Sequence, residues 1–152
     1  MTTTQQPDPL GATHDPLAGP PGPRAGFWFR FGAFFVDGLL LLVPYTFAVA
    51  ADGKGTGVDV WMLASVLYFT LLEGRPRGQT LGKRIFRIRV VDQLTGGPIG
   101  RGRAFVRWIG LWISFFVFLL GFLWMLWDPQ KQTWHDKLSK SVVVPTSAYL
   151  GD

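Results

Sequence analysis

Residues 27–43, FWFRFGAFFVDGLLLLV, decide the fold of this 152-residue chain. The segment is apolar apart from one cation, Arg30, and one carboxylate, Asp37. A charge near the middle of a bilayer costs several kcal/mol, so ionisable residues inside a span usually face the helical bundle or water. At about 3.6 residues per turn, Arg30 and Asp37 lie within about 20° of each other around the helix axis. We therefore expect both on one face of a helix, beside the small residues Gly26 and Ala33.

Two interpretations remain open for each member of this polar pair. Arg30 is either an anchor that reaches the lipid headgroups or a member of an ion-paired cluster with Glu73, Asp128 or Asp136. Asp37 is either hydrogen-bonded to a neighbouring helix or a candidate ion-binding residue that takes up a proton or cation. Its expected partners are neutral hydroxyl groups in the other apolar segments: Ser65, Tyr68, Thr70 and Ser114.

The composition is typical of a small integral membrane protein. Hydrophobic residues make up 48% of the chain, whereas charged residues make up 16%. The net charge of +5 comes from basic residues beside apolar segments, which favours membrane topology signals over binding to nucleic acid. The absence of cysteine excludes disulfides, cysteine-based zinc sites and thiolate catalysis. We expect no metal site, no cofactor and no enzymatic activity.

The chain divides into three expected parts. Residues 1–23 form a Pro-rich, disordered cytoplasmic tail, residues 24–145 a membrane domain, and residues 146–152 a short C-terminal tail. Apolar segments at 27–51 and 60–72 are two expected spans, although the second is short and needs to extend to 58–73.

A basic loop, residues 74–107, follows the second span. It contains one acid, Asp92, and nine basic residues: Arg75, Arg77, Lys83, Arg84, Arg87, Arg89, Arg101, Arg103 and Arg107. Such an excess of basic residues beside membrane spans predicts that the loop lies on the cytoplasmic side of a bacterial plasma membrane. The N-terminus is then expected on the same side. Four of these residues are candidates for contact with anionic lipid headgroups: Arg75, Arg77, Lys83 and Arg84.

The last third of the chain predicts a small sheet and a third apolar element. Residues 85–91 alternate apolar and basic side chains before a Gly-Gly-Pro turn, which predicts a cytoplasmic β-hairpin that the β-branched residues 141–144 could join. Residues 108–127 either cross the membrane once or dip in and return, with a break near Ser114 or Gly121. The predicted fold class is an all-α, multi-pass membrane bundle with this β-hairpin.

Three sequence blocks resemble the signature of the RDD family of bacterial membrane proteins. They are RFGAFFVD at 30–37, GQTLGKRIFRIRVVD at 78–92 and WDPQKQTWHDKLSKSVVV at 127–144. The resemblance implies that Arg30, Asp37 and Asp136 are the arginine and two aspartates for which the family is named. It also implies transport-related relatives, but no agreed molecular function.

The function expected from these observations is that of an accessory or assembly subunit in a membrane complex. The alternative is a transport or ion-exchange component that uses Asp37. The expected partners are the lipid bilayer, a larger membrane-protein complex or further copies of the chain, and anionic headgroups.

Overall fold

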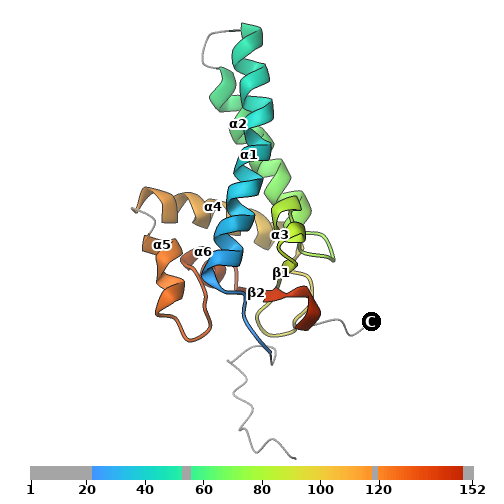
Figure 1. Ribbon diagram of the computed structural model, residues 1–152, viewed down its shortest axis with the longest axis vertical. Helices are drawn as coiled ribbons and strands as arrows, with labels where there is room; N and C mark the ends of the chain where they lie inside the picture. The colour runs from blue at the N-terminus through green and yellow to red at the C-terminus, as the bar shows by residue number, and fades with distance from the viewer. Residues whose placement is uncertain (1–21, 53–55, 118–119, 149–152) are drawn as a thin grey trace, which may run out of the picture.

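The computed structural model describes residues 22–52, 56–117 and 120–148. Nearly all of the expected Pro-rich tail, residues 1–23, and the end of the C-terminal tail lie outside these residues. Helices α1 (Phe27–Asp52) and α2 (Thr56–Glu73) form a hairpin that projects from the rest of the molecule (Figure 1). Both helices are long and apolar enough to cross a membrane. Because α2 begins at Thr56, it extends to about 27 Å, which removes the expected shortfall in length.

One face of α1 is buried along the whole base of the hairpin. Arg30, Ala33, Asp37 and Leu41 are at most 6% exposed, and they follow one another at helical spacing. Apolar side chains on the other faces, such as Phe35, are exposed. The predicted shared face of Arg30 and Asp37 is therefore confirmed.

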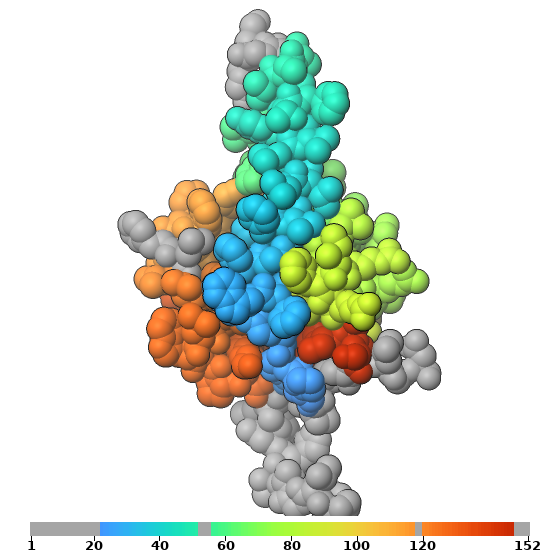
Figure 2. Space-filling model, viewed as in Figure 1, coloured from blue at the N-terminus to red at the C-terminus, as the bar shows by residue number. Residues whose placement is uncertain are grey.

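The remaining elements gather around the base of the hairpin (Figures 1 and 2). They are α3 (Leu81–Ile85), β1 (Ile88–Asp92), α4 (Gly100–Phe116), α5 (Leu120–Leu123), the 3-10 helix η1 (Trp124–Leu126), α6 (Trp134–Leu138), β2 (Ser141–Pro145) and the 3-10 helix η2 (Thr146–Ala148).

Strands β1 and β2 pair in antiparallel orientation, with Val90 opposite Val143. The expectation that residues 141–144 join this sheet is confirmed, whereas β1 does not form a hairpin with the residues that directly follow it. After β1, the Asp92 side chain accepts hydrogen bonds from the backbone N–H groups of Leu94 and Thr95, and this turn directs the chain toward α4. The partner of β1 is thus a strand far along the sequence.

Strand β1 also begins later than predicted, because residues 81–85 form the helix α3. The Thr80 side chain caps this helix by accepting a hydrogen bond from Lys83 N–H. The sheet that follows is buried on both faces. Val90 and Val143 pack with Ala25 and Ala33 at the start of α1, whereas Val142 and Val144 form a second apolar cluster with Val91 on the opposite face.

The third apolar segment is bent. The axis of α4 and the axis of residues 120–126 differ by 111°. The expected break near Gly121 is confirmed, since α4 ends at Phe116 and α5 begins at Leu120, whereas Ser114 lies inside α4. These two residues instead pack together, since a Cβ on Gly121 would lie 2.4 Å from Ser114 Oγ. The glycine therefore permits the close approach of the two arms.

Candidate functional site

Five charged side chains from five helices meet at the base of the hairpin. All are buried, with at most 8% of each residue exposed. They are Arg30 of α1, Glu73 of α2, Lys83 of α3, Arg107 of α4 and Asp136 of α6. We call this set the charge cluster.

Asp136 occupies one end of the charge cluster. Its Oδ2 lies 2.5 Å from Arg30 Nη1, and its Oδ1 accepts a hydrogen bond from Arg107 Nη1. Thr133 and Asp136 form a capping box at the start of α6, in which the Asp136 carboxylate accepts a hydrogen bond from the Thr133 backbone N–H. This bond holds the carboxylate in place. Burial alone would raise the pKa of Asp136, but the positive charges of Arg107 and Arg30 hold that pKa well below its usual range. Asp136 is therefore ionised.

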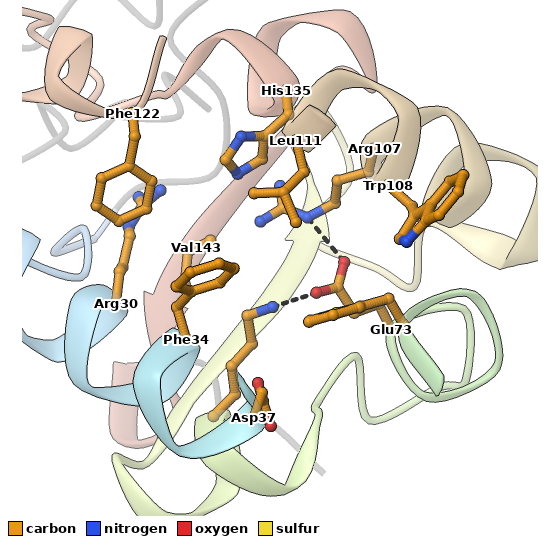
Figure 3. A pocket seen from close by; sticks show the side chains of 12 residues that line it. Arg30, Phe34, Asp37, Glu73, Arg107, Trp108, Leu111, Phe122, His135 and Val143 are labelled. Atoms are coloured by element: carbon orange, nitrogen blue, oxygen red, sulfur yellow. Dashed lines mark hydrogen bonds and ion pairs between the residues drawn. The ribbon is translucent and has the colours of Figure 1, made fainter. Parts of the chain in front are cut away.

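Glu73 occupies the other end. Its Oε2 lies 2.8 Å from Arg107 Nε, and its Oε1 accepts a hydrogen bond from Lys83 Nζ (Figure 3). Arg107 thus bridges the two carboxylates, and the charge cluster links α1, α6, α4, α2 and α3 in one continuous chain of ion pairs. Such a chain fixes the relative positions of all five helices.

Asp37 forms a second polar site on the same face of α1. Its carboxylate accepts hydrogen bonds from Tyr68 Oη at 2.6 Å, Thr80 Oγ1 at 2.6 Å and Gly82 N at 2.7 Å. Gly82 packs directly on α1, since a Cβ there would lie 2.1 Å from the carbonyl oxygen of Ala33. The carboxylate is therefore enclosed by donors from α2 and from the segment that leads into α3.

The structure brings some predicted partners together and leaves others apart. Arg30 contacts Asp136, one of its three expected partners, and Tyr68 contacts Asp37. Ser65 and Ser114 instead donate to backbone carbonyls of their own helices. The donors Thr80 and Gly82 were not predicted, because no sequence periodicity indicates that α3 folds back onto α1.

Lys83 and Arg107 were also not predicted as members of the cluster, whereas Glu73 was one of the three acids expected there, although it bonds to Lys83 and Arg107 and not to Arg30. A signal for Arg107 does exist in the sequence, since it interrupts the apolar segment of α4 as Asp37 interrupts that of α1. Arg75, Arg77 and Arg84 are exposed, as contact with lipid headgroups requires. Lys83 is buried against Glu73, so the prediction that it reaches headgroups is wrong.

A small cavity lies between the charge cluster and Asp37. Its volume is about 40 Å³, and Arg30, Asp37, Glu73 and His135 are among its lining residues (Figure 3). Burial lowers the pKa of His135 to about 3, so its imidazole is neutral. His135 Nε2 lies 2.9 Å from Thr133 Oγ1, whereas its buried Nδ1 has no hydrogen-bond partner among the described residues.

Metal ligation finds no support in the part of the chain that the structure describes. No group of three or more His, Cys, Asp or Glu side chains there could hold a metal ion. The acidic members of the charge cluster bond to arginine and lysine instead.

Comparisons with known proteins place the chain in a family. The model of the RDD family matches residues 24–140. The uncharacterized membrane protein YteJ of Bacillus subtilis is 32% identical over 144 residues, which cover 82% of this chain and 83% of the relative. The uncharacterized protein YxaI of the same organism is 29% identical over 147 residues, covering 79% of this chain and 96% of the relative.

A proline-rich antigen homolog of Mycobacterium tuberculosis is 40% identical over 68 residues, which are 45% of this chain. The matched part spans 28% of the length of that relative. No solved structure shows a significant match. The family match over most of the chain, together with the two candidate spans, leads to one conclusion: this chain is a membrane protein that belongs to the RDD family.

Proposed function

We propose that this chain is a non-enzymatic accessory or assembly subunit of a larger complex in the bacterial plasma membrane. The observation that carries the proposal is the internal pairing of the buried charges. Asp37 has three hydrogen-bond donors, and the carboxylates of Glu73 and Asp136 are each bonded to two cations. Carboxylates whose hydrogen-bonding capacity is already used inside the fold have few lone pairs left for a transported ion.

The surface of the hairpin supports the same proposal. Only 17% of the apolar window in α1 and 22% of that in α2 is buried inside the chain. Large apolar side chains such as Leu42, Phe47 and Leu63 are exposed along it. Such surfaces suit contact with lipid and with the helices of a partner protein.

The exposed charges support one orientation of the chain in the membrane. Lys83 and Arg107 form ion pairs inside the charge cluster, and Arg103 forms an ion pair with Asp92. Five arginines of the basic loop remain exposed: Arg75, Arg77, Arg84, Arg87 and Arg101. This excess supports a cytoplasmic position for the base of the hairpin, and therefore a cytoplasmic N-terminus.

Site-specific photo-crosslinking in living cells tests the accessory role. A photoreactive amino acid at Phe47 or Leu63, both exposed, should yield a discrete product with a protein other than this chain. The same probe at buried Leu41 is the matched control and should give none. Products that contain this chain alone, from both exposed positions, would contradict the proposal.

The small cavity beside Asp37, which Glu73 and His135 also line, is the observation that favours the alternative, a proton- or cation-coupled transporter. Purified chain in proteoliposomes distinguishes the two roles. We expect no proton or cation flux above that of empty vesicles, and no difference between the wild type and Asp37→Asn. Flux that the wild type supports and Asp37→Asn abolishes would establish the transport role.

A further inference from the structure

Two segments of equal length, residues 75–92 and residues 128–145, form the same succession of local structures. Each starts with a turn, continues through a five-residue helix, α3 or α6, and ends in a strand, β1 or β2. We call them the first and the second motif. Aligned from end to end without a gap, they have the same residue at these matched positions: Pro76 and Pro129, Gln79 and Gln132, Thr80 and Thr133, Val90 and Val143, Val91 and Val144.

The backbone takes the same uncommon conformations in both motifs. Gly78 and the matched Lys131 have φ of 58° and 49°, and Arg87 and the matched Lys140 have φ of 52° and 47°. Positive φ is uncommon for residues other than glycine. Within the described ranges, every non-glycine residue with positive φ lies at one of these matched positions. The likeness of the two motifs thus extends from the sequence to the backbone.

Hydrogen bonds repeat at matched positions as well. Gln79 Nε2 donates to the carbonyl oxygen of Ile88 at 2.9 Å, and Gln132 Nε2 donates to that of Ser141 at 3.0 Å. Two backbone hydrogen bonds of the first motif have a counterpart in the second: Gly78 N to Arg75 O and Lys131 N to Asp128 O, both at 2.9 Å, and Phe86 N to Gly82 O at 3.1 Å and Ser139 N to His135 O at 3.2 Å.

The two motifs pair with each other about an approximate two-fold axis. Val90 lies opposite its own counterpart Val143 in the sheet, and Val91 lies opposite Val142, the counterpart of Arg89. Reciprocal contacts of this kind are the mark of a two-fold symmetric interface. The sheet therefore has the symmetry of a dimer within one chain.

The long helix before each motif follows the same symmetry. Helix α3 packs on α1, where a Cβ on Gly82 would lie 2.1 Å from the carbonyl oxygen of Ala33. Helix α6 packs on α4, where a Cβ on Gly110 would lie 2.9 Å from the Cβ of His135, the residue matched to Gly82. In the second half of the molecule, α4 thus occupies the place that α1 has in the first.

Arg30 and Arg107 are equivalent residues of these two helices. Each precedes the contact residue of its helix, Ala33 or Gly110, by three positions, and both form an ion pair with Asp136. The charge cluster therefore lies at the interface between the two halves. The small cavity lies there too, and its lining contains both members of two equivalent pairs (Figure 3): Arg30 and Arg107, Phe34 and Leu111.

The threonine at the start of each short helix has a different hydrogen-bond acceptor in each half. Thr80 Oγ1 donates to Asp37 Oδ2 at 2.6 Å, whereas Thr133 Oγ1 lies 2.9 Å from His135 Nε2. Ser114 stands on α4 where Asp37 stands on α1, four residues after the contact residue, but its hydroxyl donates to the carbonyl group of its own helix. The imidazole of His135 is thus left as the acceptor for Thr133.

We propose that the chain consists of two copies of one unit, residues 27–92 and 100–145, and that His135 positions Thr133 in the second as Asp37 positions Thr80 in the first. Nε2 of the neutral imidazole accepts the hydroxyl proton of Thr133, and Nδ1 carries the hydrogen of the ring. Because Thr133 shares its capping box with Asp136, His135 also helps to hold that carboxylate between its two arginines. This role is independent of the accessory function proposed above.

The tautomer of the imidazole tests the role of His135 in the folded chain. His14→Asn removes the other histidine of the sequence, so the ¹⁵N spectrum of histidine-labelled protein in detergent at pH 7 reports on His135 alone. We expect a protonated Nδ1 and an unprotonated Nε2. Any other result, whether a protonated Nε2, a mixture of tautomers or a charged ring, would overturn the role of acceptor.

A transplant of residues between the two halves tests their equivalence. Ser114→Asp/His135→Gly gives the second half the carboxylate and the glycine that Asp37 and Gly82 supply in the first. We expect Ser114→Asp alone to lower the melting temperature of the full chain in detergent. The double variant should recover about 4 °C or more of that loss, because the carboxylate would then accept hydrogen bonds from Thr133 and from the backbone N–H of residue 135.

Ser114→Asp/Leu138→Ala is the matched control for this transplant. Leu138 also packs beside Gly110, where its Cδ1 would lie 3.0 Å from an added Cβ, so its truncation makes space on the same face of α6. The imidazole stays on Thr133 in this control, and we expect no recovery. Additive losses in the transplant, or equal recovery in the transplant and the control, would overturn the equivalence of the two halves.

Discussion

The Asp136 carboxylate lies between the guanidinium groups of Arg30 and Arg107 and has no exposed surface. Two buried cations share this one acid, so its removal would leave both without their counter-charge. The desolvation cost of an unpaired buried charge exceeds the gain from most surface ion pairs. At the scale of single residues, Asp136 is therefore expected to be the most sensitive position of the charge cluster.

Asp136→Asn should lower the free energy of unfolding by about 3–5 kcal/mol, the usual cost of breaking a buried pair. Thermal unfolding in detergent measures the loss. Asp128→Asn is the matched control: its partner Lys137 is 43% exposed, and we expect a loss of about 1 kcal/mol or less. Equal losses in the two variants would contradict the role given to Asp136.

His135 makes a separate prediction about pH. Its pKa is about 3 in the folded protein and about 6.5 in an unfolded chain. As the pH falls below 6.5, the unfolded chain takes up a proton that the folded protein does not, so stability decreases by up to about 1.4 kcal/mol per pH unit. Between pH 6.5 and 4.5 we expect the melting temperature of the wild type to fall more steeply than that of His135→Gln.

The titration of Asp136 does not contribute to the change in stability between pH 6.5 and 4.5. The pKa of Asp136 is lowered in the folded state, so its stabilising contribution is complete above the ordinary aspartate pKa of about 3.8 and decreases at lower pH. Parallel pH profiles for the wild type and His135→Gln would show that His135 is not held neutral by the fold.

Contacts between elements depend on small residues at the points of closest approach. Gly82 lets α3 pack on α1, because a Cβ would meet both the Ala33 carbonyl oxygen and Asp37 Oδ1 at 2.8 Å or less. The same contact brings Thr80 and the Gly82 N–H group to the Asp37 carboxylate. The position of α3 and the hydrogen bonds of Asp37 are therefore coupled.

Gly82→Ala should destabilise the protein by about 1–3 kcal/mol, as overpacking does in other cores. Gly102→Ala is the control, since Gly102 lies inside α4 with nothing within 4 Å of its added Cβ. We expect that variant to be as stable as the wild type or up to about 1 kcal/mol more stable, because alanine favours helix. A thermal shift assay in detergent compares the two, and a stable Gly82→Ala would refute the close contact.

Elements with a long apolar pattern were predictable from the sequence, and elements defined by distant contacts were not. The apolar run and the spacing of Arg30 and Asp37 indicated α1 and its buried face, and β-branched residues indicated β2. Helix α3 has five residues, too few to show a period, and its capping by Thr80 became evident in the structure. The expected pairing of residues 141–144 with the first strand is confirmed, but no hairpin partner directly follows that strand, because the turn after Asp92 leads into α4.

Only some members of the charge cluster were predictable from the sequence. Asp136 was one of three acids expected to pair with Arg30, and the structure selects it from the three. The roles of Arg107 and Lys83 depend on how α4 and α3 fold back on the hairpin. From the sequence alone, every basic residue of the loop is equally well explained as a topology signal. Burial separates structural cations such as Lys83 from exposed ones such as Arg84.

The pairing of β1 with β2 constrains the topology of the whole molecule. The two strands are hydrogen-bonded neighbours, so the chain between them must leave and return on one side of any membrane. The 111° bend between α4 and residues 120–126 permits such a return. We therefore predict two membrane crossings, α1 and α2, and a cytoplasmic base of the hairpin that contains both strands.

Cysteine labelling in intact cells tests this topology, because the sequence of 152 residues contains no cysteine. Single cysteines replace Leu94 after β1, Ser147 after β2 and Thr56 at the start of α2, and an impermeant thiol reagent is applied before and after the cells are opened. With two crossings, we expect Thr56→Cys to react in intact cells, whereas Leu94→Cys and Ser147→Cys react once the cells are opened. Labelling of Ser147→Cys but not Leu94→Cys in intact cells would place the strands on opposite sides and contradict the account.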